Sequence, residues 1–266
     1  MSTAGPSTGT GPWWRRPPVA ALVAVLLAVL LVAAVLGARG LLVVASIDPR
    51  AEYWQERAAQ PGEVVLVALG DSLSQGIGSS SPETSFVAVL AEDLAARTGQ
   101  DVRVVNLSVT GAETAELVRW QLPQLERLLA RLAADGTPVG LVTLCIGAND
   151  VDDTAPEEFR RDLVAALDAL PPGSLVADLP DFGGGPERAR AARLSEVVRE
   201  EVAARPELVQ VRLEDATAGQ GLEDYAADFF HPSDLGYQRY VAAFRDAVEA
   251  SDRRPEVPEP SPSAAA

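Results

Sequence analysis

The sequence predicts an α/β fold: a three-layer α/β/α sandwich with a five-stranded parallel sheet, preceded by one transmembrane helix. The first observation behind this prediction is that five short apolar runs alternate with helical patterns between residues 63 and 251. Second, each run is apolar throughout rather than at every other position, which is typical of parallel strands that helices cover on both faces. Third, an unbroken apolar run near the start of the chain is long enough to cross a bilayer.

The apolar run near the start, Val19 to Leu36, contains only Val, Ala and Leu. As an α-helix it would measure roughly 27 Å, close to the thickness of the hydrocarbon core of a bilayer. Residues 13–16, two Trp followed by two Arg, precede it; the arginines favour a cytoplasmic N-terminus and the indole rings favour the interface. We therefore expect a single-pass anchor in the cell membrane over residues 19–37, with the rest of the chain extracytoplasmic.

A cleaved signal peptide is the alternative, and it would make the protein secreted. The apolar run exceeds the usual length of a signal-peptide core, and Leu36 before Gly37-Ala38 departs from the small-residue cleavage pattern. Arg39, just beyond the run, argues weakly against the expected orientation. The anchor is the preferred interpretation because of the length of the run.

Composition divides the chain into five segments. Residues 1–12 are rich in Gly, Ser, Thr and Pro, and the C-terminal end carries a Pro-Glu-Val-Pro-Glu-Pro-Ser-Pro run; both compositions are typical of disordered chain. The expected organisation is a disordered cytoplasmic N-terminus at 1–18, the transmembrane anchor at 19–37, a juxtamembrane linker at 38–62, a folded domain at 63–251 and a disordered Pro-rich tail at 252–266.

The five predicted strands are continuously apolar and run from Val64 to Leu69, Val102 to Leu107, Leu141 to Ile146, Leu175 to Leu179 and Leu208 to Leu213. Right-handed helical crossovers between such strands predict a flavodoxin-like strand order. Among the intervening helices, Thr154 to Glu157 fits a capping box, and Ser233 can cap a last helix from Leu235 to Ala250. Pro123 should break or kink the helical segment from Glu113 to Ala134.

The charge and the rare residues exclude several classes of function. The chain carries 22 basic and 38 acidic residues, a formal net charge of −16, and such a surface repels nucleic acid. Cys145 is the only cysteine and His231 the only histidine. An intramolecular disulfide is therefore impossible, a catalytic zinc site is not expected, and no cofactor is expected.

The single histidine lies in a pattern that indicates acid–base chemistry. His231 follows Asp228 by three residues, so the carboxylate can bind one ring nitrogen and leave the other for a hydroxyl. Gly70-Asp71-Ser72-Leu73 directly follows the first predicted strand, where an open parallel sheet presents its ligands. We expect Ser72 as nucleophile, His231 as base and Asp228 as the orienting carboxylate, with nearby Asp234 as the alternative to Asp228.

Groups that can stabilise a negatively charged tetrahedral oxygen follow the same strand ends. The expected donors of this oxyanion hole are the backbone N–H of Ser72, the backbone N–H of Gly111 after the second strand, and the side-chain amide of Asn149 after the third. Gly111 suits this role because a residue without a side chain lets the backbone approach a ligand closely.

Together these stretches of sequence form four blocks that resemble the SGNH, or GDSL-type, esterase and acylhydrolase superfamily. The similar blocks are Gly70-Asp71-Ser72-Leu73-Ser74, Asn106-Leu107-Ser108-Val109-Thr110-Gly111, Gly147-Ala148-Asn149-Asp150 and Asp228-Phe229-Phe230-His231-Pro232. The four residues that give the superfamily its name are present in the family's order: Ser72, Gly111, Asn149 and His231. The resemblance covers the chain from Val64 to Ala250 and implies an SGNH-hydrolase fold with serine esterase, lipase or acylhydrolase activity.

The sequence thus predicts a serine hydrolase that cleaves carboxylic esters, either lipid acyl groups or O-acetyl groups, on the outer side of the membrane. Its expected partners are the ester substrate and, through the N-terminal helix, the membrane. Two alternatives are open. An acyltransferase would pass the acyl group to a cell-envelope glycan instead of water, and the same blocks would serve it. A non-catalytic, membrane-tethered binding module would predict degraded catalytic positions, whereas all four are intact.

Overall fold

Five parallel strands form the centre of the structure, a computed structural model that describes residues 17–252. Their order across the sheet is β2-β1-β3-β4-β5, which confirms the predicted fold class and flavodoxin-like arrangement. The strands are β1 (Val64–Gly70), β2 (Val102–Asn106), β3 (Val139–Cys145), β4 (Leu175–Ala177) and β5 (Val209–Val211). The segments predicted to be disordered, 1–18 and 252–266, lie outside the described residues except for Pro17, Pro18 and Asp252, which are helical.

The helices lie before, between and after these strands. The long ones are α1 (Pro17–Ala45), α2 (Ile47–Ala59), α4 (Phe86–Thr98), α6 (Leu122–Asp135), α7 (Pro156–Asp168), α8 (Pro186–Ala203) and α10 (Asp234–Asp252). Short α-helical turns are α3 (Ser72–Gln75), α5 (Thr114–Glu116) and α9 (Leu213–Thr217), and 3-10 turns span Pro82–Thr84, Asn149–Val151 and Leu222–Asp224.

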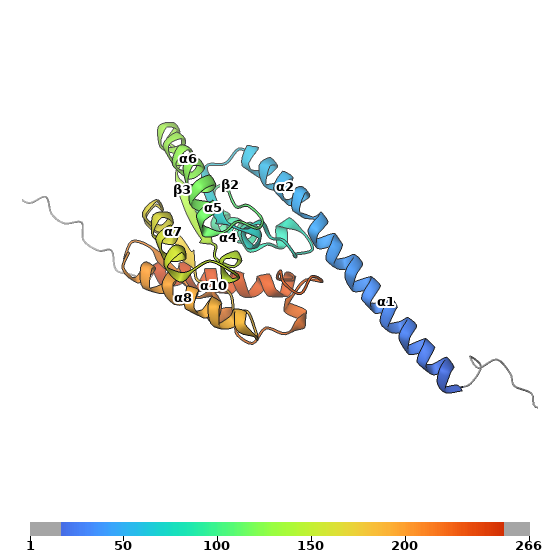
Figure 1. Cartoon of the computed structure of the whole chain (residues 1–266). Coiled ribbons are helices and arrows are strands. Elements are labelled where there is room, and N and C mark those ends of the chain that lie inside the picture. Colours follow the sequence, from blue (N-terminus) through green and yellow to red (C-terminus); the bar gives the residue numbers. More distant parts are fainter. Residues whose placement is uncertain (1–16, 253–266) are drawn as a thin grey trace, which may run out of the picture.

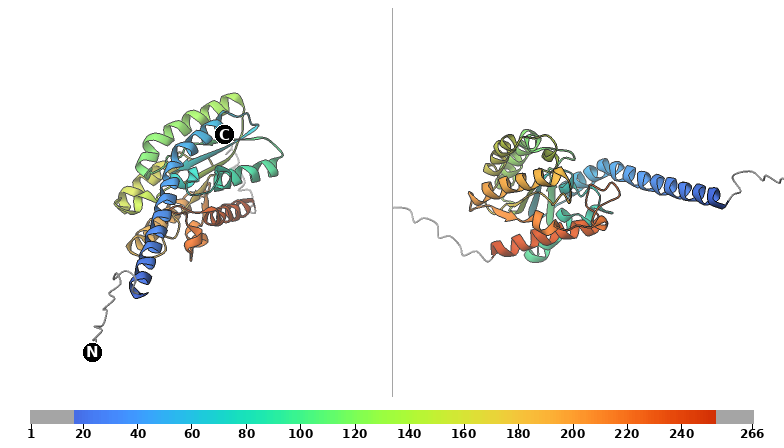
Figure 2. Two further views of the ribbon diagram at one scale, coloured as in Figure 1. Left: turned by 90° about the vertical axis from the view of Figure 1, so that its right-hand side faces the viewer. Right: turned by 60° about the horizontal axis from the view of Figure 1, so that its bottom comes forward.

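Two layers of helices cover the two faces of the sheet, as the right-hand view of Figure 2 shows. Every residue of β1 is buried, and successive side chains point to opposite layers. Val65, Val67 and Leu69 share a core with α6, α7 and α8, whereas Val64, Leu66 and Ala68 share one with α2, α4 and α10. Because both faces are covered, the strand is apolar at every position.

The helix boundaries test the predicted caps. Ser233 precedes α10 and its hydroxyl accepts the Gly236 N–H at 3.3 Å, which confirms the predicted cap. Pro123 lies in the first turn of α6, which follows a π-helical turn at Leu117–Gln121; the segment has this irregularity but no break, because the helix continues from Thr114 to Asp135. The capping box at Thr154 is wrong: α7 starts at Pro156, its N-cap is Ala155, and no side chain caps it.

The helix α1 projects away from the α/β domain (Figure 1). Its side chains from Ala21 to Arg39 are exposed. Of the described part of the chain, it is the one helix that is long and apolar enough to cross a membrane, judged by length and composition. A signal sequence has the same length and composition.

The helix α2 continues from α1 after Ser46 and packs against the domain. Trp54 is 3% exposed, and its Nε1 donates to the carbonyl of Gln75 at 3.1 Å. Arg50 is also buried and donates to the carbonyl of Ser79 at 2.5 Å. The segment 38–62, which we expected to be a linker, is therefore mostly helical and part of the core.

Replacing Trp54 tests whether α2 belongs to the folded unit. Trp54→Ala should lower the free energy of unfolding by about 3–5 kcal/mol, because it removes a buried indole and leaves a cavity. Urea unfolding of the full chain in detergent, followed by circular dichroism, measures the change. The exposed neighbour gives the control, Gln55→Ala; a loss no larger than that of the control would mean that α2 contributes nothing to the domain.

Candidate active site

Ser72 lies directly after β1, at the first position of α3. The turn that presents it depends on Gly70, whose φ is +141°. A Cβ built on Gly70 would lie 1.9 Å from the carbonyl oxygen of Cys145 on β3. The side-chain amide of Gln121 also brackets Gly70, accepting its N–H at 2.9 Å and donating to its carbonyl at 2.7 Å. Only glycine fits at this point of the turn.

Ser72, His231 and Asp228 lie in one continuous chain of hydrogen bonds. His231 Nε2 is 2.9 Å from Ser72 Oγ, and His231 Nδ1 is 2.7 Å from Asp228 Oδ2. The second carboxylate oxygen of Asp228 accepts the backbone N–H groups of Phe230 and His231 at 3.1 and 3.0 Å. The fold thus brings together the three side chains that the sequence singled out.

Asp234, the alternative to Asp228, has other partners. Its carboxylate accepts the backbone N–H of Ser80 at 2.9 Å and the hydroxyls of Ser80 and Thr84 at 2.6 and 2.7 Å. Among residues 17–252, the carboxylate that contacts the imidazole is that of Asp228.

Asp228 is held in its ionised form. Partial burial raises the pKa of its carboxyl, but hydrogen bonds from the His231 ring and from two backbone N–H groups outweigh burial and lower this pKa below its ordinary value. A carboxylate beside Nδ1 favours the tautomer that carries its proton there. Nε2 is then an acceptor for the Ser72 hydroxyl.

The three predicted oxyanion donors follow three adjacent strands, β1, β2 and β3. The backbone N–H groups of Ser72 and Gly111 have no hydrogen-bond acceptor within the described chain. Asn149 Nδ2 donates to the carbonyl of Ala112 at 2.9 Å, which ties Asn149 to the residue next to Gly111 and leaves one amide hydrogen over. Ser72 and Asn149 line one cavity; Gly111 is exposed and lies outside its lining.

Gln75 is a residue of the site that the sequence analysis missed. It is 7% exposed; its Nε2 donates to the carbonyl of Ser108 at 2.8 Å, and its Oε1 accepts the Thr110 hydroxyl at 2.9 Å. These bonds hold the loop that leads into Gly111. No local pattern identifies such a side chain, because its partners lie more than 30 residues away in the chain.

A cavity of about 640 Å³ opens beside Ser72 and Asn149. Its walls come from the segment after β4, residues 180–184, and from the segment before α10, residues 220–232. Its large apolar lining side chains are Leu73, Phe182, Leu222, Phe229 and Phe230. The size and the apolar walls suit a small organic substrate.

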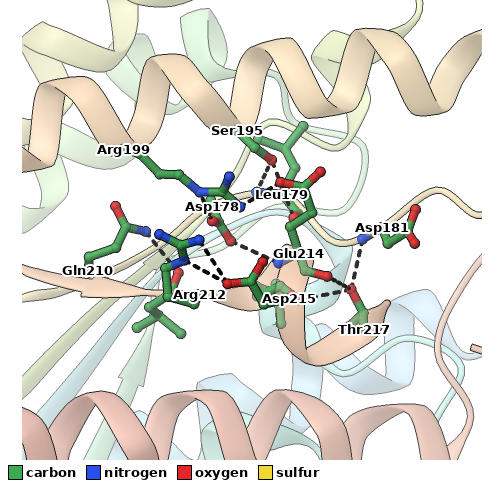
Figure 3. A network of polar contacts seen from close by, with 12 residues as sticks. Asp178, Leu179, Asp181, Ser195, Arg199, Gln210, Arg212, Glu214, Asp215 and Thr217 are labelled. Atoms are coloured by element: carbon green, nitrogen blue, oxygen red, sulfur yellow. Dashed lines mark hydrogen bonds and ion pairs between the residues drawn. The ribbon is translucent and has the colours of Figure 1, made fainter. Parts of the chain in front are cut away.

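A polar network holds the wall that follows β4, and Figure 3 shows its members converging from α8, α9 and that wall. Asp178 is fully buried and forms an ion pair with Arg199, with 2.6 Å between Arg199 Nε and Asp178 Oδ2. The same guanidinium pairs with Glu214, with 2.5 Å between Arg199 Nη2 and Glu214 Oε2. Thr217 Oγ1 accepts the backbone N–H of Asp181 at 2.7 Å. The wall is therefore fixed by long-range contacts that no sequence pattern indicated.

Comparison with known proteins gives a family and a fold. The sequence model of the GDSL-like lipase/acylhydrolase family matches residues 68–239. A similar solved structure is the crystal structure of TesA, whose sequence is 26% identical to this one. The match covers 70% of this chain and 98% of the TesA chain, with a TM-score of 0.52. A search of curated proteins finds no match.

Two further solved structures share the fold at lower identity. A lipase/acylhydrolase from Enterococcus faecalis is 22% identical, covers 70% of this chain and 96% of its own, and has a TM-score of 0.52. An acetyl xylan esterase from Geobacillus stearothermophilus is 21% identical, covers 69% of this chain and 94% of its own, and also has a TM-score of 0.52.

Asp71, next to Ser72, is the most perturbed carboxyl of the site. It is completely buried; one oxygen accepts the Leu73 N–H at 2.9 Å, and the other has no partner within residues 17–252. Burial raises the pKa of Asp71 to about 7, and the nearby charge of Asp150 adds to the rise. In the folded state the protonated form of Asp71 is therefore favoured below a pH of about 7.

The raised pKa of Asp71 predicts a pH-dependent stability. The folded-state pKa lies above the unfolded value, so the contribution of this group is fully present below pH 4 and is lost as the pH rises through about 7. Asp71→Asn cannot ionise, so its stability relative to the unmodified chain should rise over this interval and then level off. Urea unfolding of both chains from pH 4 to 8 measures the difference; a difference independent of pH would contradict the raised pKa.

Proposed function

Because the chain belongs to the GDSL-like lipase/acylhydrolase family, and is thereby a carboxylic ester hydrolase, we propose that Ser72, His231 and Asp228 are its catalytic triad. The observation that carries this proposal is the hydrogen-bond chain from Asp228 through the imidazole to the serine hydroxyl, at 2.7 and 2.9 Å. Hydrogen-bond contact between nucleophile and base, with the base oriented by a third group, is the requirement for an activated serine.

In the first half of the reaction, Ser72 Oγ attacks the ester carbonyl while His231 Nε2 takes the hydroxyl proton. Asp228 stabilises the resulting imidazolium. The tetrahedral intermediate collapses when His231 returns this proton to the departing alkoxide, which leaves as an alcohol. The acyl group is then bound to Ser72 as an ester.

In the second half, a water molecule attacks the acyl-enzyme. His231 Nε2 accepts a proton from the water and then protonates Ser72 Oγ as the acyl carbon–oxygen bond breaks. The products are a carboxylic acid and the free serine. No cofactor takes part in either half.

The proposed oxyanion hole consists of the backbone N–H groups of Ser72 and Gly111 and the side-chain amide of Asn149. Two observations support it: these backbone groups have no acceptor within residues 17–252, and Asn149 keeps one amide hydrogen free while the other fixes its orientation on Ala112. Donors that are already aligned stabilise the developing charge without further rearrangement.

We further propose that residues 19–37 anchor the protein in the cell membrane and that a hydrolase domain at 63–251 lies on its outer side. The length and composition of α1 support the anchor, and cleavage with secretion is the alternative. Candidate substrates are lipid acyl esters and O-acetyl groups; the acetyl xylan esterase with the same fold acts on an ester of the second kind.

Replacing the nucleophile tests the mechanism directly. Ser72→Ala should lower kcat for a short p-nitrophenyl ester by about 10⁴- to 10⁶-fold, because no group remains to form the acyl-enzyme. Turnover is measured on the full chain in detergent, with Ser251→Ala on α10 as the control. Hydrolysis by the Ser72 variant at the rate of the control would rule out the mechanism.

The position of His231 depends on close contact with Gly78. Gly78 has φ +94°, and a Cβ built there would lie 2.7 Å from the Cβ of His231 and 2.5 Å from the carbonyl oxygen of Pro232. Any side chain at position 78 therefore pushes the loop that carries the imidazole.

Gly78→Ala should lower kcat for the same ester by about 100-fold, since a displacement of about 1 Å between reacting groups has an effect of this size. The matched control is Gly99→Ala, because Gly99 also has a positive φ, but a Cβ built on it would have no atom within 4 Å. Equal kcat values for the two variants would show that the Gly78 contact does not position the imidazole.

A further inference from the structure

We propose that the end of the domain that carries the active-site opening rests on the bilayer that α1 crosses. This inference goes beyond the catalytic mechanism but depends on the proposed role of α1 as a membrane anchor. Three features of the molecule support it: the distribution of exposed apolar side chains, the attachment of α1 to the domain, and the position along α1 of residues 227–232, the loop that carries Asp228 and His231 and is called the catalytic loop below.

The large exposed apolar side chains of the domain lie in segments that come after the carboxyl ends of two strands. Between Ile47 and Asp252, the large hydrophobic residues that are exposed are Val109, Trp120, Leu222, Phe229, Phe230 and Leu235. All of them belong to segments that follow the carboxyl ends of β2 or β5, the side at which Ser72 is presented. Three of them, Leu222, Phe229 and Phe230, also line the cavity beside Ser72, and exposed apolar side chains gathered around a cavity are typical of an interaction site.

The attachment of α1 to the domain is rigid. Only Ser46 separates α1 from α2, and α2 is locked by the buried side chains of Arg50 and Trp54, which bind the carbonyls of Ser79 and Gln75. These carbonyls belong to the segment that follows Ser72. The direction of α1 is therefore set by contacts beside the active site, and Figures 1 and 2 show α1 leaving from the end of the domain where the segment before α10 lies.

The catalytic loop lies close to the expected membrane surface. Gly40 of α1 faces Ala227, whose carbonyl oxygen would be 3.9 Å from a Cβ built on Gly40. The proposed anchor ends at residue 37, and three further residues of helix amount to roughly 4.5 Å. Phe229 and Phe230, 54% and 52% exposed, come two and three residues after Ala227. The loop that carries them therefore begins at a height where apolar side chains can enter the interface, which they do to a depth of roughly 5–10 Å.

The same end of α1 carries exposed apolar side chains beyond the anchor. Leu41, Leu42 and Val44 are 71%, 69% and 61% exposed, and no other part of the described chain covers them. A bilayer that reaches this level covers both these residues and the aromatic side chains of the catalytic loop. The cavity beside Ser72 then opens at the lipid surface, where an ester carried by the membrane can enter without crossing water.

A fluorescent label can measure the position of the catalytic loop. Cys145 is buried, and burial raises the pKa of its thiol well above the usual value, so an added exposed cysteine takes a thiol-reactive, polarity-sensitive dye selectively. We would label Phe229→Cys and, as control, Gln100→Cys. Gln100 lies between α4 and β2, at the amino end of that strand, whereas Ser72 follows the carboxyl end of β1. Both full-length chains are placed in phosphatidylcholine vesicles, whose zero net charge avoids repulsion of the acidic domain.

The expected result is blue-shifted emission at position 229 and quenching by nitroxide-bearing lipids that is several-fold stronger than at position 100. A polar helical heptad inserted between Arg39 and Gly40 provides a second test. It lifts the domain by roughly 10 Å and turns it by only about 20°, so it should abolish the quenching at position 229 without altering the domain.

Equal emission and equal quenching at positions 229 and 100 in the chain without the insertion would overturn the inference, as would quenching at 229 that survives the insertion. Hydrolysis of a soluble p-nitrophenyl ester by the unlabelled chain keeps the two proposals apart. Retained hydrolysis together with a water-exposed label refutes only the membrane contact, whereas a label in the bilayer without any hydrolysis refutes only the proposed enzymatic mechanism.

Discussion

The hydrogen bond between Ser72 Oγ and His231 Nε2 joins residues that are 159 positions apart, and the chemistry of the site depends on it. Neither partner is held by its own segment alone. The serine is presented by the turn at Gly70, which touches β3, and the loop of His231 packs against Gly78. Tyr237 of α10 adds a link, since its buried hydroxyl donates to the carbonyl of Ile77 at 2.8 Å. The site is thus assembled by close backbone contacts between distant segments.

Buried and partly buried polar side chains do much of this assembly. Gln121 brackets the backbone of Gly70, Gln75 holds the loop before Gly111, and Asn149 ties that loop to the end of β3. A buried amide is stabilising only when its donors and acceptors are paired. These residues therefore restrict the loops to conformations that pair them, and one of these loops leads into Gly111, whose backbone N–H is proposed for the oxyanion hole.

The relation between α1, the proposed anchor, and the domain differs from that of a globule on a flexible tether. The segment between them is a helix with buried Trp54 and Arg50, and its contacts are backbone carbonyls of the segment that follows Ser72. As a membrane anchor, the role proposed for it, α1 would restrain the orientation of the domain as well as its distance from the bilayer. The helix α2 lies before the residues that the family model matches, 68–239.

The sequence by itself determined the fold class, the five strands and the four blocks at their ends, because continuous apolar runs and turn residues are local signals that survive without tertiary context. It also singled out Ser72, Asp228 and His231, since a chain with one histidine offers one imidazole. It did not identify the roles of Gln75, Gln121, Gly78 or Tyr237, and it read residues 38–62 as a linker although Trp54 is a core residue. Tertiary structure decided these features, because each depends on which distant backbone a side chain meets, and spacing along the chain carries no information about that contact.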